Sequence, residues 1–290
     1  MIVIHLPVML REVIMLLRPR SGGIYVDATI GFGGHSEEIL RHIGDGRLIG
    51  IDRDEEALTM AIRRLSDERV IVKKGKFSEI KQVITDAGVT GVDGILFDLG
   101  TSMLHLKTPE RGFSFLSGER LDMRMDNKQA LTAWNIVNEY PEDDIEKILR
   151  EYGEEKFSRR IAKAIAMRRE EKNIDTCAEL SDITWRAYRK RGRIHPATRT
   201  FQALRIAVND ELCELEKGLV ASLDVLKSQG RLCAISYHSL EDRIVKNFMR
   251  NNQKDGRLNV ITKKPLVPSY EEIRKNPSAR SAKLRGAERI

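Results

Sequence analysis

The residues of this chain best suited to chemistry are a glycine-rich turn and an acidic residue that follows it. Gly31, Gly33 and Gly34 come after a short apolar stretch and before a helical pattern. Glycines allow the backbone to approach a ligand closely, and a helix start presents unpaired N–H groups to it. Asp52 follows Gly31 by 21 residues, near the spacing of about 20 at which an acid binds ribose hydroxyls. The pattern predicts a nucleotide site, and a tight turn with a surface aspartate is the alternative.

The dinucleotide-binding fingerprint is incomplete in this turn. Ser36 stands where that fingerprint requires its third glycine. The methyltransferase version has an acid on the first strand and a looser glycine turn, and Asp27 supplies that acid. S-adenosylmethionine contains no pyrophosphate, so a looser glycine pattern is enough to bind it. A nicotinamide-dependent oxidoreductase remains the alternative enzyme class.

The elements that must position these residues alternate between strands and helices. We expect strands at 24–29, 47–51, 70–72 and 92–97, separated by helical patterns that include 54–65 and 78–87. This alternation predicts an α/β fold with a Rossmann-like, mostly parallel sheet and right-handed crossovers.

Polar or aromatic residues follow these four strands and a fifth strand that we expect at 232–236. They are His35, Asp52, Phe77, Asp98 and His238. Because the carboxyl ends of parallel strands share one edge of a sheet, where ligands bind, we expect these five residues at that edge. Phe77 is suited to lie against an adenine ring, or else it belongs to the core.

The alternation stops after the fourth strand. Helical patterns occupy 130–138, 142–151, 154–171, 176–190 and 200–228; a strand at 232–236, a helix at 239–251 and two late strands, 260–262 and 282–287, follow. The sequence therefore predicts a core domain made of 1–107 and 211–290, interrupted by a helical insertion, 108–210.

Charge and cysteine content narrow the class of protein. The 290 residues include 50 basic and 43 acidic side chains, with 15 basic against 9 acidic in 150–210 and 13 against 4 in 243–290. Two basic segments favour a polyanionic partner, although solvated helix faces also explain them. The three cysteines form no CxxC motif, which argues against a zinc ribbon or disulfide framework and fits a reducing cytoplasm. No apolar run reaches the ~18 residues of a membrane span.

Eight short motifs, taken together, resemble one family. They are His5–Val8, Asp27–Ser36, Asp98–Ser102, Arg111–Phe115, Leu121–Asp126, His195–Gln202, Ser236–Arg243 and Asn276–Ser281. In this order and at these spacings they closely resemble the bacterial 16S ribosomal RNA cytosine-N4 methyltransferases, the MraW/RsmH family, from about His5 to Arg289.

The resemblance implies a class I S-adenosylmethionine-dependent methyltransferase with an inserted helical domain. Its substrate is then a decoding-region cytosine of 16S ribosomal RNA, within the small ribosomal subunit, with no membrane partner. The family's cofactor contacts fall here on Gly33, Gly34, His35, Asp52, Phe77, Asp98 and His105. His105 stands where the family usually has glutamine.

Transfer of a methyl group to the cytosine amine also needs a proton acceptor, since the lone pair of that nitrogen is delocalised into the ring. Asp98 is the candidate, although no Pro-Pro-aromatic motif follows it, and a purely cofactor-binding role is the alternative. His195, Arg199 and His238 are candidate RNA contacts, each with a structural alternative. No spacing of His, Cys and carboxylates indicates a metal site. A non-enzymatic ribosome assembly factor also explains the basic segments.

Overall fold

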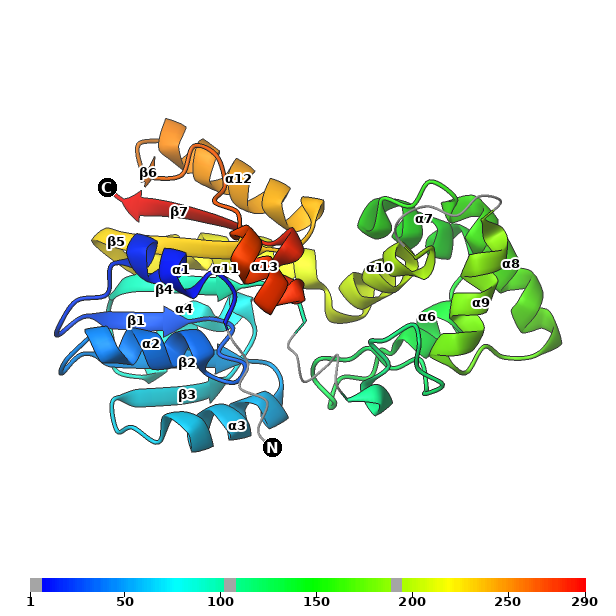
Figure 1. The fold of residues 1–290 in the computed structure, drawn as a ribbon, viewed down its shortest axis with the longest axis horizontal. Helices are drawn as coiled ribbons and strands as arrows, with labels where there is room; N and C mark the ends of the chain where they lie inside the picture. The colour runs from blue at the N-terminus through cyan, green and yellow to red at the C-terminus, as the bar shows by residue number, and fades with distance from the viewer. Residues whose placement is uncertain (1–6, 102–107, 189–194) are drawn as a thin grey trace. The chain divides into compact units, whose positions relative to one another are not determined.

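The computed structural model describes residues 7–101, 108–188 and 195–290, which form two compact units (Figure 1). Met1–Gly100 and Leu212–Ile290 make up the sheet unit, and Thr101–Glu211 makes up the helical unit. The insertion limits expected from the sequence, 108–210, lie inside these bounds and remain a prediction.

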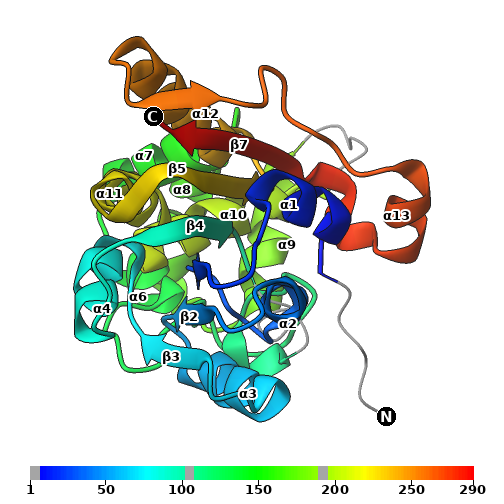
Figure 2. The ribbon, with the colours of Figure 1, turned by 90° about the vertical axis from the view of Figure 1, so that its left-hand side faces the viewer.

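The sheet unit is organised by a seven-stranded sheet in the order β3–β2–β1–β4–β5–β7–β6 (Figure 2). The strands are β1 (Ile24–Asp27), β2 (Arg47–Asp52), β3 (Val70–Lys74), β4 (Val92–Asp98), β5 (Leu226–Ser236), β6 (Leu258–Val260) and β7 (Lys283–Arg289). The pairs among β1 to β5 are all parallel, and β7 is antiparallel to β5 and β6. The mostly parallel, Rossmann-like sheet predicted from the sequence is confirmed. Strand β4 pairs with β5, although the helical unit separates them in the chain.

Apolar residues cover both faces of this sheet because successive side chains of a strand point to opposite faces. Along β5, Leu232 and Ala234 pack into one core cluster, whereas Cys233 and Ile235 pack into another. The first cluster includes residues of α4 (Ile80–Asp86), α11 (Glu211–Val225) and α12 (Ser239–Lys254), and the second includes residues of α1 (Leu10–Leu17) and α2 (Gly34–His42). The other helical elements here are α3 (Glu55–Leu65), α13 (Tyr270–Lys275) and the 3-10 turns η1 (Phe77–Glu79) and η3 (Pro277–Ser281).

The sequence analysis missed α1 and α13, which meet through one hydrogen bond. The backbone N–H of Met9, at the start of α1, donates to the Glu272 carboxylate of α13 at 2.6 Å. These two residues lie 263 positions apart, so no local pattern reports the contact.

The helical unit has a core of its own. The described elements of this unit are η2 (Pro109–Arg111), α6 (Ala133–Glu139), α7 (Glu142–Gly153), α8 (Ser158–Glu171), α9 (Cys177–Ala187) and α10 (Ala197–Asn209). The single helix expected at 200–228 was wrong, because Asp210 has a left-handed φ of 50° and ends α10 before α11 begins. Within the described ranges, no helix is long and apolar enough to cross a membrane.

A close contact between α11 and η1 gives a first prediction. A Cβ added at Gly218 would lie 2.5 Å from Cβ of Phe77 and 3.2 Å from its carbonyl group. We expect Gly218→Ala to lower the free energy of unfolding by about 1–3 kcal/mol, since overpacking outweighs alanine's higher helix propensity. Urea denaturation measures this. The control is Gly118→Ala, because a Cβ there meets nothing within 4 Å; equal effects of the two substitutions would contradict the prediction.

Candidate functional site

The carboxyl end of β1 holds a buried acid. Asp27 is 1% exposed, and its carboxylate accepts hydrogen bonds from the Ser36 hydroxyl at 2.7 Å and the Thr29 backbone N–H at 3.2 Å. Burial raises the pKa of Asp27 above its ordinary value, and the nearby His35 partly opposes that shift. Ser36, the residue that breaks the dinucleotide fingerprint, therefore joins the start of α2 to the end of β1.

Asp98, at the end of the neighbouring strand β4, brings together side chains from two other elements. Its Oδ1 accepts a hydrogen bond from the Tyr237 hydroxyl at 2.7 Å, and its Oδ2 lies 3.6 Å from Nδ1 of His35. The other ring nitrogen of His35 donates to the carbonyl of Val8 at 2.9 Å. Two of the five residues expected at this edge, His35 and Asp98, thus lie beside each other.

The pKa of the Asp98 carboxyl differs from that of an ordinary aspartate. Loss of solvent raises its pKa to about 6, against the opposing effects of His35 and the Tyr237 hydrogen bond. In turn, burial and the Asp98 carboxylate hold the pKa of Tyr237 well above its ordinary value. A carboxyl group that titrates near neutral pH is suited to accept a proton during a reaction.

Tyr237 is the residue that the sequence analysis missed. Its ring also lies against Gly100, where an added Cβ would be 3.3 Å from the tyrosine Cδ2. Its position directly before His238, at the end of a strand, was the available signal.

His238 has a structural task at the start of α12. Its Nδ1 accepts a hydrogen bond from the Glu241 N–H at 3.3 Å, and its Nε2 lies 3.1 Å from that residue's carboxylate. Glu241 is 2% exposed and also accepts the backbone N–H of Tyr237 at 2.7 Å. The described contacts make His238 a helix cap, and its role as an RNA contact stays a prediction.

The glycine turn and Asp52 lie against each other, as a nucleotide site requires. Asp52 Oδ2 accepts the Gly31 N–H at 3.0 Å, and its Oδ1 accepts the Asp54 N–H at 3.0 Å. Gly31 and Gly33 have left-handed φ values of 48° and 77°, which glycine adopts without strain. A carboxylate has about four lone-pair sites and can accept several hydrogen bonds at once. The N–H groups of Gly34 and His35 belong to the first turn of α2, which has no intrahelical acceptors for them.

Phe77 follows β3 at the same edge. Its half-buried ring meets Phe97 edge-on at 5.3 Å between centroids, and the Arg53 guanidinium carbon lies 5.9 Å from the ring centre. The ring therefore belongs partly to the core, and its partial exposure is compatible with contact to a base.

The remaining three candidates are His105, His195 and Arg199. His105 falls in 102–107, outside the described residues. His195 and Arg199 belong to the helical unit. There Arg199 donates to the carbonyl of Glu154, at the end of α7, at 2.9 Å. Within 7–101, 108–188 and 195–290, no cluster of three or more His, Cys, Asp or Glu is arranged to hold a metal ion.

Known proteins match this chain from end to end. A model of the MraW methylase family matches residues 2–290. Ribosomal RNA small subunit methyltransferase H of Carboxydothermus hydrogenoformans is 49% identical over 305 residues, covering 99% of this chain and 98% of the relative. The protein of the same name from Persephonella marina is 49% identical over 291 residues, covering 99% of each chain. A solved rRNA methylase from Streptococcus thermophilus has 13% identity and a TM-score of 0.44, covering 97% of this chain and 93% of the other.

The raised pKa of Asp98 predicts a particular dependence of stability on pH. A carboxyl whose pKa rises from 3.8 to about 6 on folding holds its proton more tightly in the folded state. Its contribution to the free energy of unfolding therefore falls as the pH rises from about 4 to 6, by roughly 3 kcal/mol in total. Asp98→Asn removes this titration, so its stability relative to the wild type should increase with pH and level off above pH 7.

Urea denaturation of both proteins between pH 4 and 8 measures the difference. Acids with lowered pKa values, such as Asp93 and Asp242, titrate in both proteins, so their contributions cancel in the difference between the two stability curves. Parallel stability curves would show that the pKa of Asp98 does not change on folding.

Proposed function

This chain belongs to the MraW methylase family, and from that membership we propose that it methylates the exocyclic N4 amine of a cytosine in the decoding region of 16S ribosomal RNA. The coarser activity follows from the family itself: the chain is an S-adenosylmethionine-dependent methyltransferase of small-subunit ribosomal RNA. The observation that carries the proposal is the edge of the parallel sheet, where the glycine turn, Asp52 and Asp98 meet in a chain matched over its full length.

The residues at this edge fit S-adenosylmethionine. First-turn N–H groups of α2 and the glycine turn would face its polar groups, Asp52 would accept its ribose hydroxyls, and Phe77 would lie against its adenine. His35 would take part through its backbone N–H, since its ring is held by Val8 and Asp98. Bound there, the cofactor supplies a methyl group on a positively charged sulfur.

The protein's own part in the reaction is to align the amine and remove a proton. The new bond joins N4 to the methyl carbon, the carbon–sulfur bond breaks, and one N4 proton must leave. Alignment of the two reactants can supply several kcal/mol of the barrier. Asp98 either contacts the cofactor or receives that proton. A pKa of about 6 favours the second role, because it makes the carboxylate a stronger base than an ordinary aspartate and still leaves it mostly ionised at pH 7.

Both alternatives are disfavoured. A nicotinamide-dependent oxidoreductase has no support among relatives named as methyltransferases, and Ser36 occupies the third glycine position. A non-enzymatic assembly factor does not explain why polar side chains gather at one sheet edge. We further propose that the substrate is the small ribosomal subunit in the cytoplasm; the free state of Cys177, Cys213 and Cys233 supports a reducing compartment.

The direct test uses small subunits from a strain that lacks this methylation. Incubation with S-adenosylmethionine carrying a labelled methyl group, followed by mass mapping of the RNA, should place one methyl group on N4 of a decoding-region cytosine. Label on another atom or another region would overturn the proposal.

Asp52 provides the test of the cofactor site. Asp52→Ala leaves the ribose hydroxyls without a charged acceptor, and such hydrogen bonds are worth ~1.5–3 kcal/mol. The Kd for S-adenosylmethionine should rise roughly ten- to a hundredfold, as measured by calorimetric titration. Asp45→Ala is the matched control, because this exposed acid precedes β2 and lies at the opposite edge of the sheet. An unchanged Kd in a folded Asp52→Ala variant would show that Asp52 does not bind the cofactor.

A further inference from the structure

Tyr237 connects the end of β5 to Asp98, the candidate proton acceptor. Its hydroxyl donates to Oδ1 of Asp98 at 2.7 Å. The tyrosine is itself held at two points, because its backbone N–H donates to the Glu241 carboxylate at 2.7 Å and its ring lies against Gly100. A side chain fixed in this way holds its hydroxyl, and with it the Asp98 carboxylate, in one orientation.

The Tyr237 hydroxyl is a donor to Asp98 and not a second proton acceptor. Burial, followed by the Asp98 carboxylate, holds the pKa of Tyr237 well above its ordinary value, and Glu241 and Glu272 act in the same direction. The phenol therefore keeps its proton throughout the neutral pH range. Oδ1 of Asp98 has this donor whenever the carboxyl is ionised.

The other oxygen of Asp98 faces a ring nitrogen of His35. Nε2 of His35 donates to the carbonyl of Val8 at 2.9 Å, so the neutral ring carries its proton there and has a lone pair on Nδ1. Nδ1 lies 3.6 Å from Oδ2 of Asp98. A proton on Oδ2 would thus face an acceptor. The Asp98 side chain is 21% exposed, so a ligand can still reach the carboxyl group.

We propose that Tyr237 is a positioning residue for methyl transfer: its hydroxyl holds Oδ1 of Asp98, so that Oδ2 receives the proton that leaves the cytosine amine. The proposal rests on the function given above. As the bond between N4 and the methyl carbon forms, the carbon–sulfur electron pair stays on sulfur and the N4 proton moves to Oδ2. The protonated carboxyl keeps Oδ1 as a carbonyl oxygen, which still accepts from Tyr237.

The same hydrogen bond also affects how readily Asp98 ionises. Burial raises the pKa of Asp98 most strongly, His35 and the Tyr237 hydroxyl oppose that shift, and Asp27 and Glu241 raise the pKa further. A hydrogen bond to the ionised form favours that form, so its loss raises the pKa. Removing the Tyr237 hydroxyl leaves the other four influences in place.

The kinetic test compares Tyr237→Phe with the wild type, since this change removes the hydroxyl and keeps the ring against Gly100. Single-turnover methyl transfer to small subunits is measured from pH 5 to 9. The acid limb of the rate should move to higher pH by about one unit, because hydrogen bonds to charged groups typically contribute that much. At the pH where the wild type is half-maximal, the variant should then react about fivefold more slowly. At pH 8.5 its rate and its Kd for S-adenosylmethionine should match those of the wild type.

A second measurement does not depend on activity. With aspartate labelled with carbon-13, NMR follows the titration of the Asp98 carboxyl carbon, whose signal is assigned by its loss in Asp98→Asn. The midpoint should rise by about one unit in Tyr237→Phe. An unchanged midpoint would overturn the proposal. So would a raised midpoint with an unchanged acid limb, because Asp98 would then not receive the proton.

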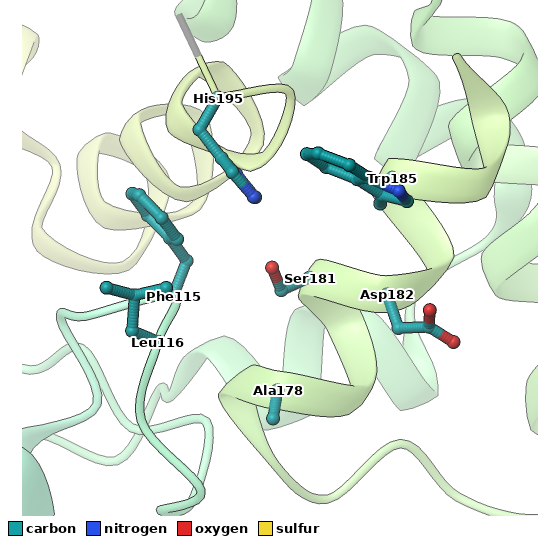
Figure 3. A pocket seen from close by; sticks show the side chains of 7 residues that line it. All are labelled: Phe115, Leu116, Ala178, Ser181, Asp182, Trp185 and His195. Carbon is teal, nitrogen blue, oxygen red and sulfur yellow. The ribbon is translucent and has the colours of Figure 1, made fainter. Parts of the chain in front are cut away.

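Two control variants should keep the wild-type acid limb. Tyr25→Phe also removes a phenol hydroxyl from the sheet unit, but the partners of that hydroxyl are the backbone groups of Arg18 and Arg20. Leu116→Ala changes the other unit, where Leu116 is 80% exposed beside a pocket of about 370 Å³ (Figure 3). A shifted limb in either control would show that the shift in Tyr237→Phe does not report the hydrogen bond to Asp98.

This proposal and the proposed function fail in different ways. If the wild-type protein transfers no methyl group to the subunit, the proposed function fails, and the NMR titration alone decides whether Tyr237 controls Asp98. If the wild type is active and Tyr237→Phe keeps its acid limb, Tyr237 is not a positioning residue and the proposed function stands. A rate lowered equally at every pH would likewise reduce Tyr237 to a structural role.

Discussion

Two carboxylates at the ends of adjacent parallel strands, the buried Asp27 and the partly exposed Asp98, determine how the sheet edge is arranged. A buried carboxylate is costly unless hydrogen bonds satisfy it, so each must recruit donors from neighbouring elements. Asp27 draws in Ser36 and thereby fixes the start of α2, while Asp98 draws in Tyr237 and fixes the connection from β5 to α12. His35 faces Asp98 from α2 and joins the two arrangements. The glycine turn lies between Asp27 and Ser36 in the chain, and its Gly31 N–H donates to Asp52.

The fold was largely predictable because its signals are local. Apolar runs of strand length alternate with helical periodicity, and this alone indicates the mostly parallel sheet. Boundaries that depend on single backbone angles were not predictable. Asp210 ends α10 in a left-handed conformation inside an otherwise continuous helical pattern, and α1 depends on a contact with Glu272 from the far end of the chain.

The candidate site was predictable only for residues that mark the ends of strands. Asp52 and Asp98 are visible because each is an acid directly after an apolar strand. Tyr237 was harder to find, since its partner lies 139 positions away and its place at a strand end, directly before His238, is only a weak signal. The histidines show what the sequence leaves open: type and position predict ligand contacts, and the structure adds that His238 caps a helix and that the ring of His35 contacts Val8 and Asp98. The sequence shows which polar groups are present, but only the folded structure shows which of them already form contacts within the protein.

The insertion of the helical unit between β4 and β5 also bears on how the chain folds. These neighbouring strands are separated by the whole of Thr101–Glu211, and closing so long a loop carries an entropic cost that grows with its length. The helical unit has its own core and is built of helices, whose local contacts favour rapid folding. Once folded, it replaces a long flexible loop with a compact body. We expect the closing of the sheet at β4 and β5 to be the slow step, so that core substitutions in the helical unit delay assembly of a sheet that they do not touch.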